Sequence, residues 1–256
     1  MITLRRAKER RCDQRRKREI WLTFCPTEPN DPFAGGLGIL ETLNEERLPP
    51  GAGVPRHSNH DAEVITYARE GALAYEDSEG CSGVIQTGEF QRMTPGPGIH
   101  HNETNASRTE WAQVFQIGFR CGQTGLESGY EQKRFSAAQR RDGLCVVASP
   151  DARRGSLRIH QDALVYSAML DPGQHVVHEL SPGRRAWLHV VHGEITLGDL
   201  VLITGDGAGL TDERAVSLTA QAKTEILLLD VGVGLLGFPR IDEFHNQEPV
   251  ANQRLS

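Results

Sequence analysis

Two short clusters of histidine and acidic residues are the part of this sequence that could do chemistry. Residues 56–67 read RHSNHDAEVITY, and residues 96–103 read GPGIHHNE. Neutral imidazole and carboxylate groups together suit divalent iron, nickel, copper or manganese, and two or three such ligands leave coordination positions open for dioxygen or a substrate. The two clusters therefore indicate a metal site, with His57, His101 and Glu103 as candidate ligands.

The spacing within each cluster fits presentation from β-strands. Alternate side chains of a strand share a face, so positions 57 and 59 point the same way, as do positions 101 and 103. Position 59 is Asn59, whose amide oxygen is a weaker and harder ligand than imidazole. His60 would need a β-bulge to reach the face of His57, and Glu63 is the other nearby residue that could supply a carboxylate. Both alternatives stay open from the sequence.

Longer stretches around these clusters resemble a known family. The matching segments are ITLRRA near the start, EVITYAREGALAYEDSEG, GEFQRMTPGPGIHHNE, YEQKRF and SPDARRGSLRIHQDALVY. They resemble the pirin family, and within it the bacterial quercetinase-like two-barrel cupins, over about residues 1–235. The resemblance implies a metal site of three histidines and a glutamate, presented as H-x-H and H-x-E. It carries over as His57, His101 and Glu103, with Asn59 where the second histidine would stand.

The same resemblance implies an activity and its partners. It predicts a metal-dependent dioxygenase that cleaves flavonols such as quercetin, with a flavonol-like aromatic substrate and dioxygen as partners. The expected cofactor is a divalent metal ion, Fe(II) first, with Ni, Cu, Mn or Zn as alternatives. Glu103 would be both ligand and general base for the flavonol hydroxyl. The alternatives are a metal- or redox-responsive regulatory protein with a protein partner, and a cupin whose metal site is degenerate because of Asn59.

Composition and turn signals agree with an all-β protein of two cupin β-barrels in tandem, a bicupin with short helical connections. The chain has 256 residues, 27 glycines and 13 prolines, which suits many short strands joined by turns. We expect a first barrel over residues 1–134 with the metal site, a second over 135–236 without metal ligands, and a tail over 237–256. EVITYAREGALAYED predicts a hairpin that bends at Glu70 and Gly71. GDGAGL, at residues 205–210, is expected to occupy the second barrel's equivalent of GPGIHHNE.

The remaining histidines and the cysteines give weaker signals. His175 and His178 are an odd number of residues apart, as are His189 and His192, which predicts scattered packed or surface histidines.

The five cysteines form no C-x-x-C pair, and the N-terminus is Arg-rich instead of apolar, which predicts a reduced, cytoplasmic protein. No apolar run approaches the roughly 18 residues of a membrane span. Cys121 follows an arginine and is a candidate redox sensor, with an inert buried cysteine as the alternative.

Residues 5–18 form a basic arm. They contain nine Lys or Arg against two acidic residues, a charge of +7, and this leaves −13 for the rest of a chain whose net charge is −6. Such an asymmetry raises the question of nucleic-acid binding. No aromatic interleaving or recognition motif accompanies the charge, so we favour an edge strand and a solvated loop folded against the acidic body.

Overall fold

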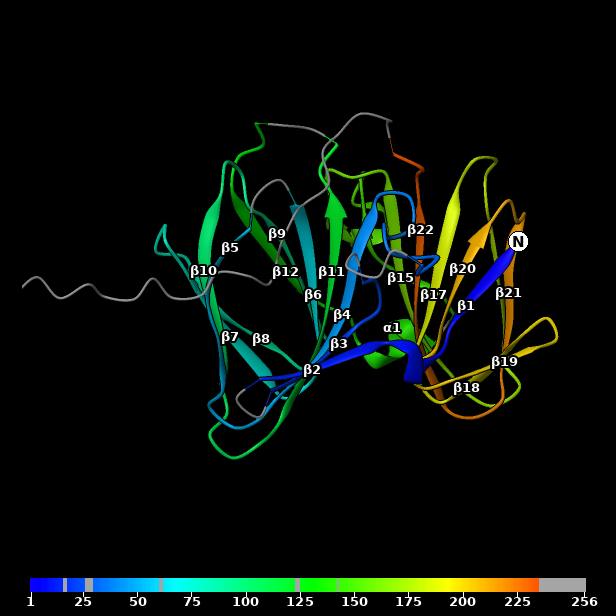
Figure 1. Ribbon diagram of the computed structural model, residues 1–256, viewed down its shortest axis with the longest axis horizontal. Coiled ribbons are helices and arrows are strands. Elements are labelled where there is room, and N and C mark those ends of the chain that lie inside the picture. Colours follow the sequence, from blue (N-terminus) through cyan, green and yellow to red (C-terminus); the bar gives the residue numbers. More distant parts are fainter. Residues whose placement is uncertain (16–17, 26–29, 60–61, 123–124, 142, 235–256) are drawn as a thin grey trace, which may run out of the picture.

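Two β-barrels lie side by side in the computed structural model of the chain (Figure 1). The structure describes residues 1–15, 18–25, 30–59, 62–122, 125–141 and 143–234, and for residues 15 and 55–59 it describes the backbone only. Within these residues the chain forms 22 strands, one short α-helix, α1 (Ala137–Arg141), and two 3-10 helices, η1 (Ala7–Glu9) and η2 (Arg153–Gly155). The prediction of an all-β bicupin with short helical connections is confirmed.

Each barrel consists of one seven-stranded and one four-stranded sheet. The large sheet of the first barrel has, in spatial order, β12 (Gly129–Arg134), β9 (Glu89–Thr94), β6 (Ala62–Glu70), β11 (Ala112–Arg120), β4 (Leu40–Leu48), β3 (Arg18–Leu22) and β2 (Arg11–Arg15). Its small sheet has β5 (Gly53–Asn59), β10 (Ile99–Asn105), β7 (Ala72–Asp77) and β8 (Ser82–Gln86).

The second barrel repeats this arrangement. Its large sheet has β1 (Ile2–Arg5), β20 (Gly207–Thr211), β17 (Arg185–His192), β22 (Thr224–Val231), β15 (Ala163–Leu170), β13 (Cys145–Ser149) and β14 (Leu157–Arg158). Its small sheet has β16 (His175–Glu179), β21 (Ala215–Ala220), β18 (Glu194–Leu197) and β19 (Leu200–Ile203). The matching order makes β21 the counterpart of β10, and β20 the counterpart of β9. The expectation that GDGAGL occupies the place of GPGIHHNE is therefore wrong, because that segment runs into β20 in the other sheet.

The predicted hairpin at Glu70 and Gly71 is also wrong. β6 pairs with β9 and β11 in the large sheet, whereas β7 pairs with β8 and β10 in the small one. Gly71, at φ +72°, is the corner where the chain passes from one sheet to the other. A Cβ atom at this position would lie 2.6 Å from the carbonyl oxygen of Trp111, so the corner requires glycine both for its φ and for its close approach to β11.

The N-terminal strand belongs to the second barrel. β1 pairs antiparallel with β20 at the edge of the large sheet, with Ile2 opposite Leu210. The chain then crosses to the first barrel, where β2 and β3 form a hairpin. The strands before and after residue 134 thus belong to different barrels, except for β1, which comes first in the chain but belongs to the second barrel. The predicted tail over residues 237–256 lies outside the described residues.

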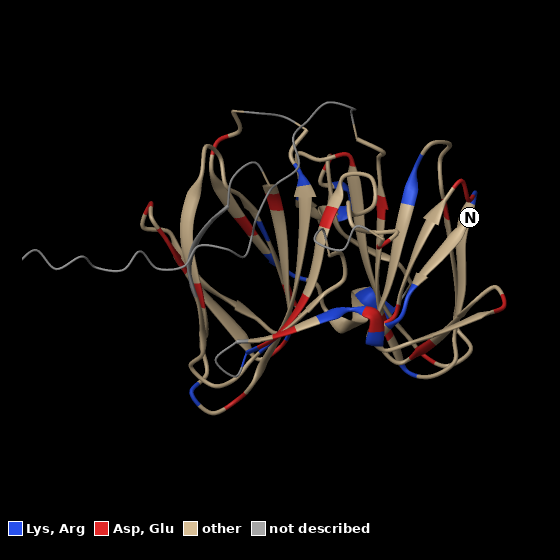
Figure 2. Cartoon of the chain, in the orientation of Figure 1, with Lys and Arg blue, Asp and Glu red and all other residues tan. Residues whose placement is uncertain are grey.

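The basic arm folds against the acidic body of the protein, as we favoured from the sequence, and β1 is an edge strand. The expected solvated loop is wrong, because the arm continues through η1 into the paired strands β2 and β3. Figure 2 shows its blue residues beside red ones where the arm passes between the barrels. Its ion pairs, with distances where the contact is of ordinary length, are Arg5 with Asp31, Arg6 with Asp206 at 2.8 Å, Arg10 with Glu45 at 2.8 Å, Arg11 with Asp13 at 3.1 Å and Arg18 with Glu46 at 2.7 Å. Four of these five acids belong to other segments, so they offset part of the arm's charge.

An aromatic core lies between the barrels. Phe24 and Phe33 pack edge-on against Trp187, with ring centroids 4.8 and 5.0 Å away. Leucine, isoleucine, valine and alanine from β15, β17, β18, β20, β21 and β22 form the hydrophobic core of the second barrel. In the first barrel the apolar filling is smaller and includes Leu48, Leu73 and Val114, which leaves the other part of its interior for polar side chains.

A polar network also crosses this interface. The Tyr67 hydroxyl donates to Glu225, and Arg140 Nη1 donates to the Tyr67 hydroxyl at 2.7 Å and to Glu225 Oε1 at 3.0 Å. Burial, reinforced by the charge of Glu225, raises the pKa of Tyr67. The phenol therefore stays protonated and serves as a donor. Among the described residues no helix is long and apolar enough to cross a membrane.

Candidate metal site

Strand β10 presents His101 and Glu103 to the interior of the first barrel. Burial alternates along the strand: His101 and Glu103 are 3% and 6% exposed, whereas His100 is exposed. The alternation follows from the two-residue period of a strand and places both candidate ligands on one face, as predicted. His100 is thereby separated from this face.

Strand β5 runs antiparallel to β10 and brings the other histidine to the same level. The register sets His57 opposite His101 and Asn59 opposite Ile99. A β-bulge falls between Val54 and His57, around Pro55, where a residue without an N–H group is readily tolerated. From position 57 to 59 the pairing is regular, so the bulge lies before His57 and leaves residues 57–59 in register with β10.

The side chains of His57 and Asn59 lie outside what the structure describes, as does all of His60. Among the side chains that it does describe, no three His, Cys, Asp or Glu residues converge as a metal-binding group. His101 and Glu103 are thus the described part of the candidate site, and His57 is placed by its backbone register alone.

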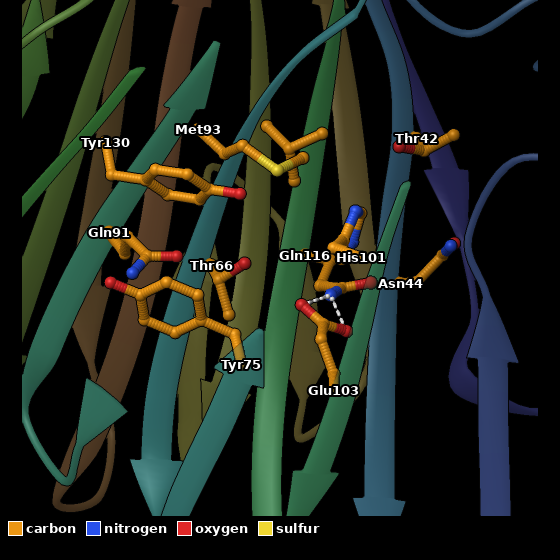
Figure 3. Close-up of a pocket in the computed structure, with 11 residues that line it drawn as sticks. Thr42, Asn44, Thr66, Tyr75, Gln91, Met93, His101, Glu103, Gln116 and Tyr130 are labelled. Atoms are coloured by element: carbon orange, nitrogen blue, oxygen red, sulfur yellow. Dashed lines mark hydrogen bonds between the residues drawn. The ribbon is translucent and has the colours of Figure 1, made fainter. Parts of the chain in front are cut away.

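A cavity opens in front of His101 and Glu103 (Figure 3). The cavity has a volume of about 30 Å³, counted as the space open to the centre of a water-sized sphere. This is room for one or two waters or a metal ion. Its walls come from five strands of the large sheet and two of the small sheet: Thr42, Asn44, Val64, Thr66, Tyr75, Gln91, Met93, Gln116 and Tyr130 line it together with His101 and Glu103.

Gln116 holds the carboxylate of Glu103. Its Nε2 atom lies 2.9 Å from Oε1 and 2.8 Å from Oε2, so one amide nitrogen donates to both oxygens (Figure 3). A buried carboxylate is costly unless it is hydrogen-bonded, and this amide offsets part of that cost. Gln116 reaches the cavity from β11, where it pairs with Thr66 on β6 and Asn44 on β4.

Two tyrosines form an aromatic wall of the cavity. The rings of Tyr75 and Tyr130 are stacked, with centroids 5.2 Å apart and planes at 25°. Burial raises the pKa of both phenols, and the nearby Asp77 carboxylate raises that of Tyr130 further. Both side chains are therefore neutral phenols near pH 7, with hydroxyl groups able to take part in hydrogen bonds.

The structure places Glu63 away from the cavity. Val64 and Thr66 line the cavity, so Glu63, one step along β6, faces the opposite side of the sheet. Its Oε1 accepts from the Thr94 hydroxyl at 2.8 Å and lies 2.8 Å from His160 Nδ1, and its Oε2 accepts from the backbone N–H of His160 at 2.8 Å. The expectation that Glu63 could add a carboxylate to the metal site conflicts with these contacts, which tie β6 to the loop between β14 and β15 of the second barrel.

Cys121 lies just beyond the end of β11 and is half-buried. Gln161 Nε2 donates to its sulfur at 3.5 Å, while the neighbouring Arg120 pairs with Glu41 at 2.6 Å. The arginine that suggested this cysteine is thus directed to a carboxylate and not to the sulfur.

At the equivalent level the second barrel is apolar. The shared topology and register match His101, Glu103 and Gln116 with Val216, Leu218 and Leu228. These three side chains are at most 1% exposed and belong to the apolar filling.

The other histidines of the second barrel have separate surroundings. His175 is exposed and contacts Thr219, His178 lies 2.8 Å from Asp230, His189 is fully buried and His192 is exposed. This agrees with the prediction of scattered packed and surface histidines.

The sequence did not single out Gln116 or the tyrosine wall. A glutamine in the middle of the mostly apolar strand AQVFQIGFR is a signal for Gln116, because a central strand buries both faces and retains a polar side chain only where it has a partner. Tyr130 appeared only within the matching segment YEQKRF, without an assigned role. Its contact with Tyr75 depends on tertiary structure.

The paired barrels and the buried His and Glu on one strand define a two-barrel cupin. The family model for pirin matches residues 5–118, and that for the quercetinase C-terminal cupin domain matches residues 146–231. The chain is 38% identical over 231 residues to the quercetin 2,3-dioxygenase of Escherichia coli K12, covering 90% of this chain and 99% of that protein. It therefore belongs to the pirin family.

Solved structures agree with this assignment. The crystal structure of YhhW from E. coli matches with a TM-score of 0.86 and 37% identity, covering 92% of this chain and 100% of that one. The structure of the bacterial pirin YhhW from E. coli in complex with nickel(II) matches with a TM-score of 0.84 and 36% identity, covering 91% and 99% of the two chains.

Proposed function

We propose that this protein is a metal-dependent dioxygenase of the quercetinase type, which opens flavonols such as quercetin with dioxygen. The observation that carries the proposal is the burial of His101 and Glu103 side by side in a cavity, with His57 opposite His101 in the strand register. The relative named quercetin 2,3-dioxygenase, with 38% identity along almost its whole length, supports it.

The donor set suits a divalent transition metal. Two imidazoles and one carboxylate are the ligands of many non-haem Fe(II) oxygenases, and nickel(II) also accepts them. We propose His57, His101 and Glu103 as ligands, with Asn59 where an amide oxygen or a water would complete the set, and Fe(II) as the native ion. When bound, the metal would supply Lewis-acid polarisation and orient substrate and dioxygen.

The chain's own residues would select and prepare the substrate. The space lined by the described residues is small, so a flavonol would enter with its hydroxyl and carbonyl edge while its rings stay toward the mouth. The Glu103 carboxylate would accept the proton of the flavonol hydroxyl, and Gln116 would keep that carboxylate in place. The stacked tyrosines, Tyr75 and Tyr130, offer an apolar wall to an aromatic ligand.

The test is metal content and oxygen uptake on the same sample. Protein purified without chelator is analysed for metals, loaded with Fe(II) anaerobically and assayed with quercetin in an oxygen electrode. We expect His101→Ala to lose both metal and oxygen uptake. The matched control is His100→Ala, the same change one residue away on the exposed face of β10, which should retain both. Equal metal content in wild type and His101→Ala would refute the site.

A second function is favoured by Asn59, which stands where the family's metal site would have its second histidine. In this alternative the protein is a metal- or redox-responsive regulatory member of the family that acts through a protein partner and shows little turnover when loaded. Cys121, half-exposed and hydrogen-bonded by Gln161, would be its redox residue. Mild peroxide should then oxidise Cys121 before the exposed Cys12, because burial and nearby acids raise the pKa of the Cys12 thiol. Uniform oxidation of all cysteines, read by peptide mass spectrometry, would count against this alternative.

A further inference from the structure

Gln116 occupies the fork of the Glu103 carboxylate. Its Nε2 is almost equally far from the two oxygens, at 2.9 and 2.8 Å, so it lies close to the axis that bisects the carboxylate. A metal ion chelated by both oxygens would need this same axis. We propose that Gln116 is a positioning residue that restricts Glu103 to binding the metal through one oxygen. This inference rests on the metal site proposed above.

One-oxygen binding has a chemical consequence for the site. A carboxylate can bind a divalent ion with one or both oxygens, and chelation takes up one more coordination position. With the fork closed by the amide, the second oxygen stays outside the metal's coordination sphere and remains able to accept a proton from a bound hydroxyl group. Gln116 would thereby keep a coordination position open and preserve Glu103 as a base.

The position of Gln116 is fixed by the sheet. It lies in β11, a central strand hydrogen-bonded on one side to β6 and on the other to β4, with Thr66 and Asn44 as its register partners. These two neighbours are 4% and 9% exposed, so the amide has little room to swing away from Glu103.

The second barrel has apolar residues at the positions equivalent to Gln116 and Glu103. There Leu228 stands in the position of Gln116, and Leu218 in that of Glu103. Carboxylate and amide are thus present together in one barrel and absent together from the equivalent described positions of the other. The pairing fits a joint role, and Leu228 shows that leucine packs at this place in the fold.

Nickel(II) binding by Gln116→Leu tests the inference, with Gln116→Met as a second variant of closer shape. Titration calorimetry should give a nickel(II) dissociation constant about 10- to 100-fold weaker than that of wild type, the usual cost of losing an outer partner of a metal ligand. In the infrared difference spectrum, the splitting between the two carboxylate stretches should narrow on nickel binding in the variants, because Glu103 is then free to chelate.

The matched control is Gln113→Met. Gln113 lies on the same strand but on the opposite face, where its Nε2 donates to Glu45 at 2.6 Å. Its removal should leave nickel affinity and the carboxylate bands unchanged. Wild-type affinity and wild-type bands in both Gln116 variants would overturn the positioning role while leaving the metal site intact. Wild-type protein that binds no nickel(II) would overturn the metal site and the inference with it.

Discussion

His189 should make the stability of the protein fall in mild acid. The side chain is completely buried between the barrels, 5.8 Å from the ring centre of Phe115, and neither ring nitrogen has a hydrogen-bond partner among the described residues. Burial, reinforced by the charge of Arg10, lowers the pKa of this imidazole well below 6.5. The folded protein therefore keeps His189 neutral at pH values where the unfolded chain protonates it.

The magnitude follows from proton linkage. Above pH 6.5 both states hold a neutral imidazole, and the group has little effect on the pH dependence of stability. Below it the unfolded state binds one more proton, so the free energy of unfolding falls by about 1.4 kcal/mol per pH unit. Between pH 7 and pH 5 the loss from this one residue is about 2 kcal/mol. Methionine in its place would remove the titration and two buried polar atoms while filling a similar volume.

Denaturant unfolding at pH 5, 6 and 7 measures this effect. The difference in unfolding free energy between His189→Met and wild type should grow by about 2 kcal/mol from pH 7 to pH 5, because titrations common to both proteins cancel. His192→Asn, which changes an exposed histidine at the end of the same strand, serves as the control and should show no such growth. A constant difference between His189→Met and wild type across this range would refute the reasoning.

Three further changes have defined outcomes. Tyr67→Phe removes the hydroxyl that joins Arg140 and Glu225, and should lower the unfolding free energy by about 1–3 kcal/mol, measured by denaturant titration, with the far-ultraviolet spectrum unchanged. Gly71→Ala forces a side chain into a left-handed corner against the backbone of β11 and should lower the melting temperature by several degrees, whereas Gly129→Ala, where a Cβ would meet only Arg92 Nη1 at 4.0 Å, should not. Asn59→His should tighten metal binding in calorimetry, and an unchanged affinity would remove position 59 from the ligand set.

The sequence predicted the fold class because its signals are local. Short strands, frequent turns and the matching segments all indicate tandem barrels, and alternation correctly places His101 and Glu103 on one buried face. Which strands pair with one another was harder to predict from the sequence. The corner at Gly71 and a tight hairpin turn both require glycine at positive φ, and only tertiary contacts decide between them.

The sequence indicated candidate ligands for the site but did not predict their surroundings. His101 and Glu103 follow from a two-residue spacing, whereas the bond from Gln116 depends on which strands become neighbours in the large sheet. Glu63 was considered as a ligand for its residue type, and the alternation of β6 places it on the other face. The pairing of β1 with β20 joins residues 202 to 208 positions apart, a distance over which no local pattern carries information.

That pairing of β1 with β20 links the order of synthesis to the order of folding. Strand β1 is synthesised long before its partner, Gly207–Thr211, so it stays unpaired while the barrel with the candidate metal site is being synthesised. Closing such a distant contact is slow compared with local strand pairing, which makes it a late step in folding. A deletion or extension at the amino terminus should therefore disturb the second barrel first, the one made last, and leave the ligand strands β5 and β10 paired.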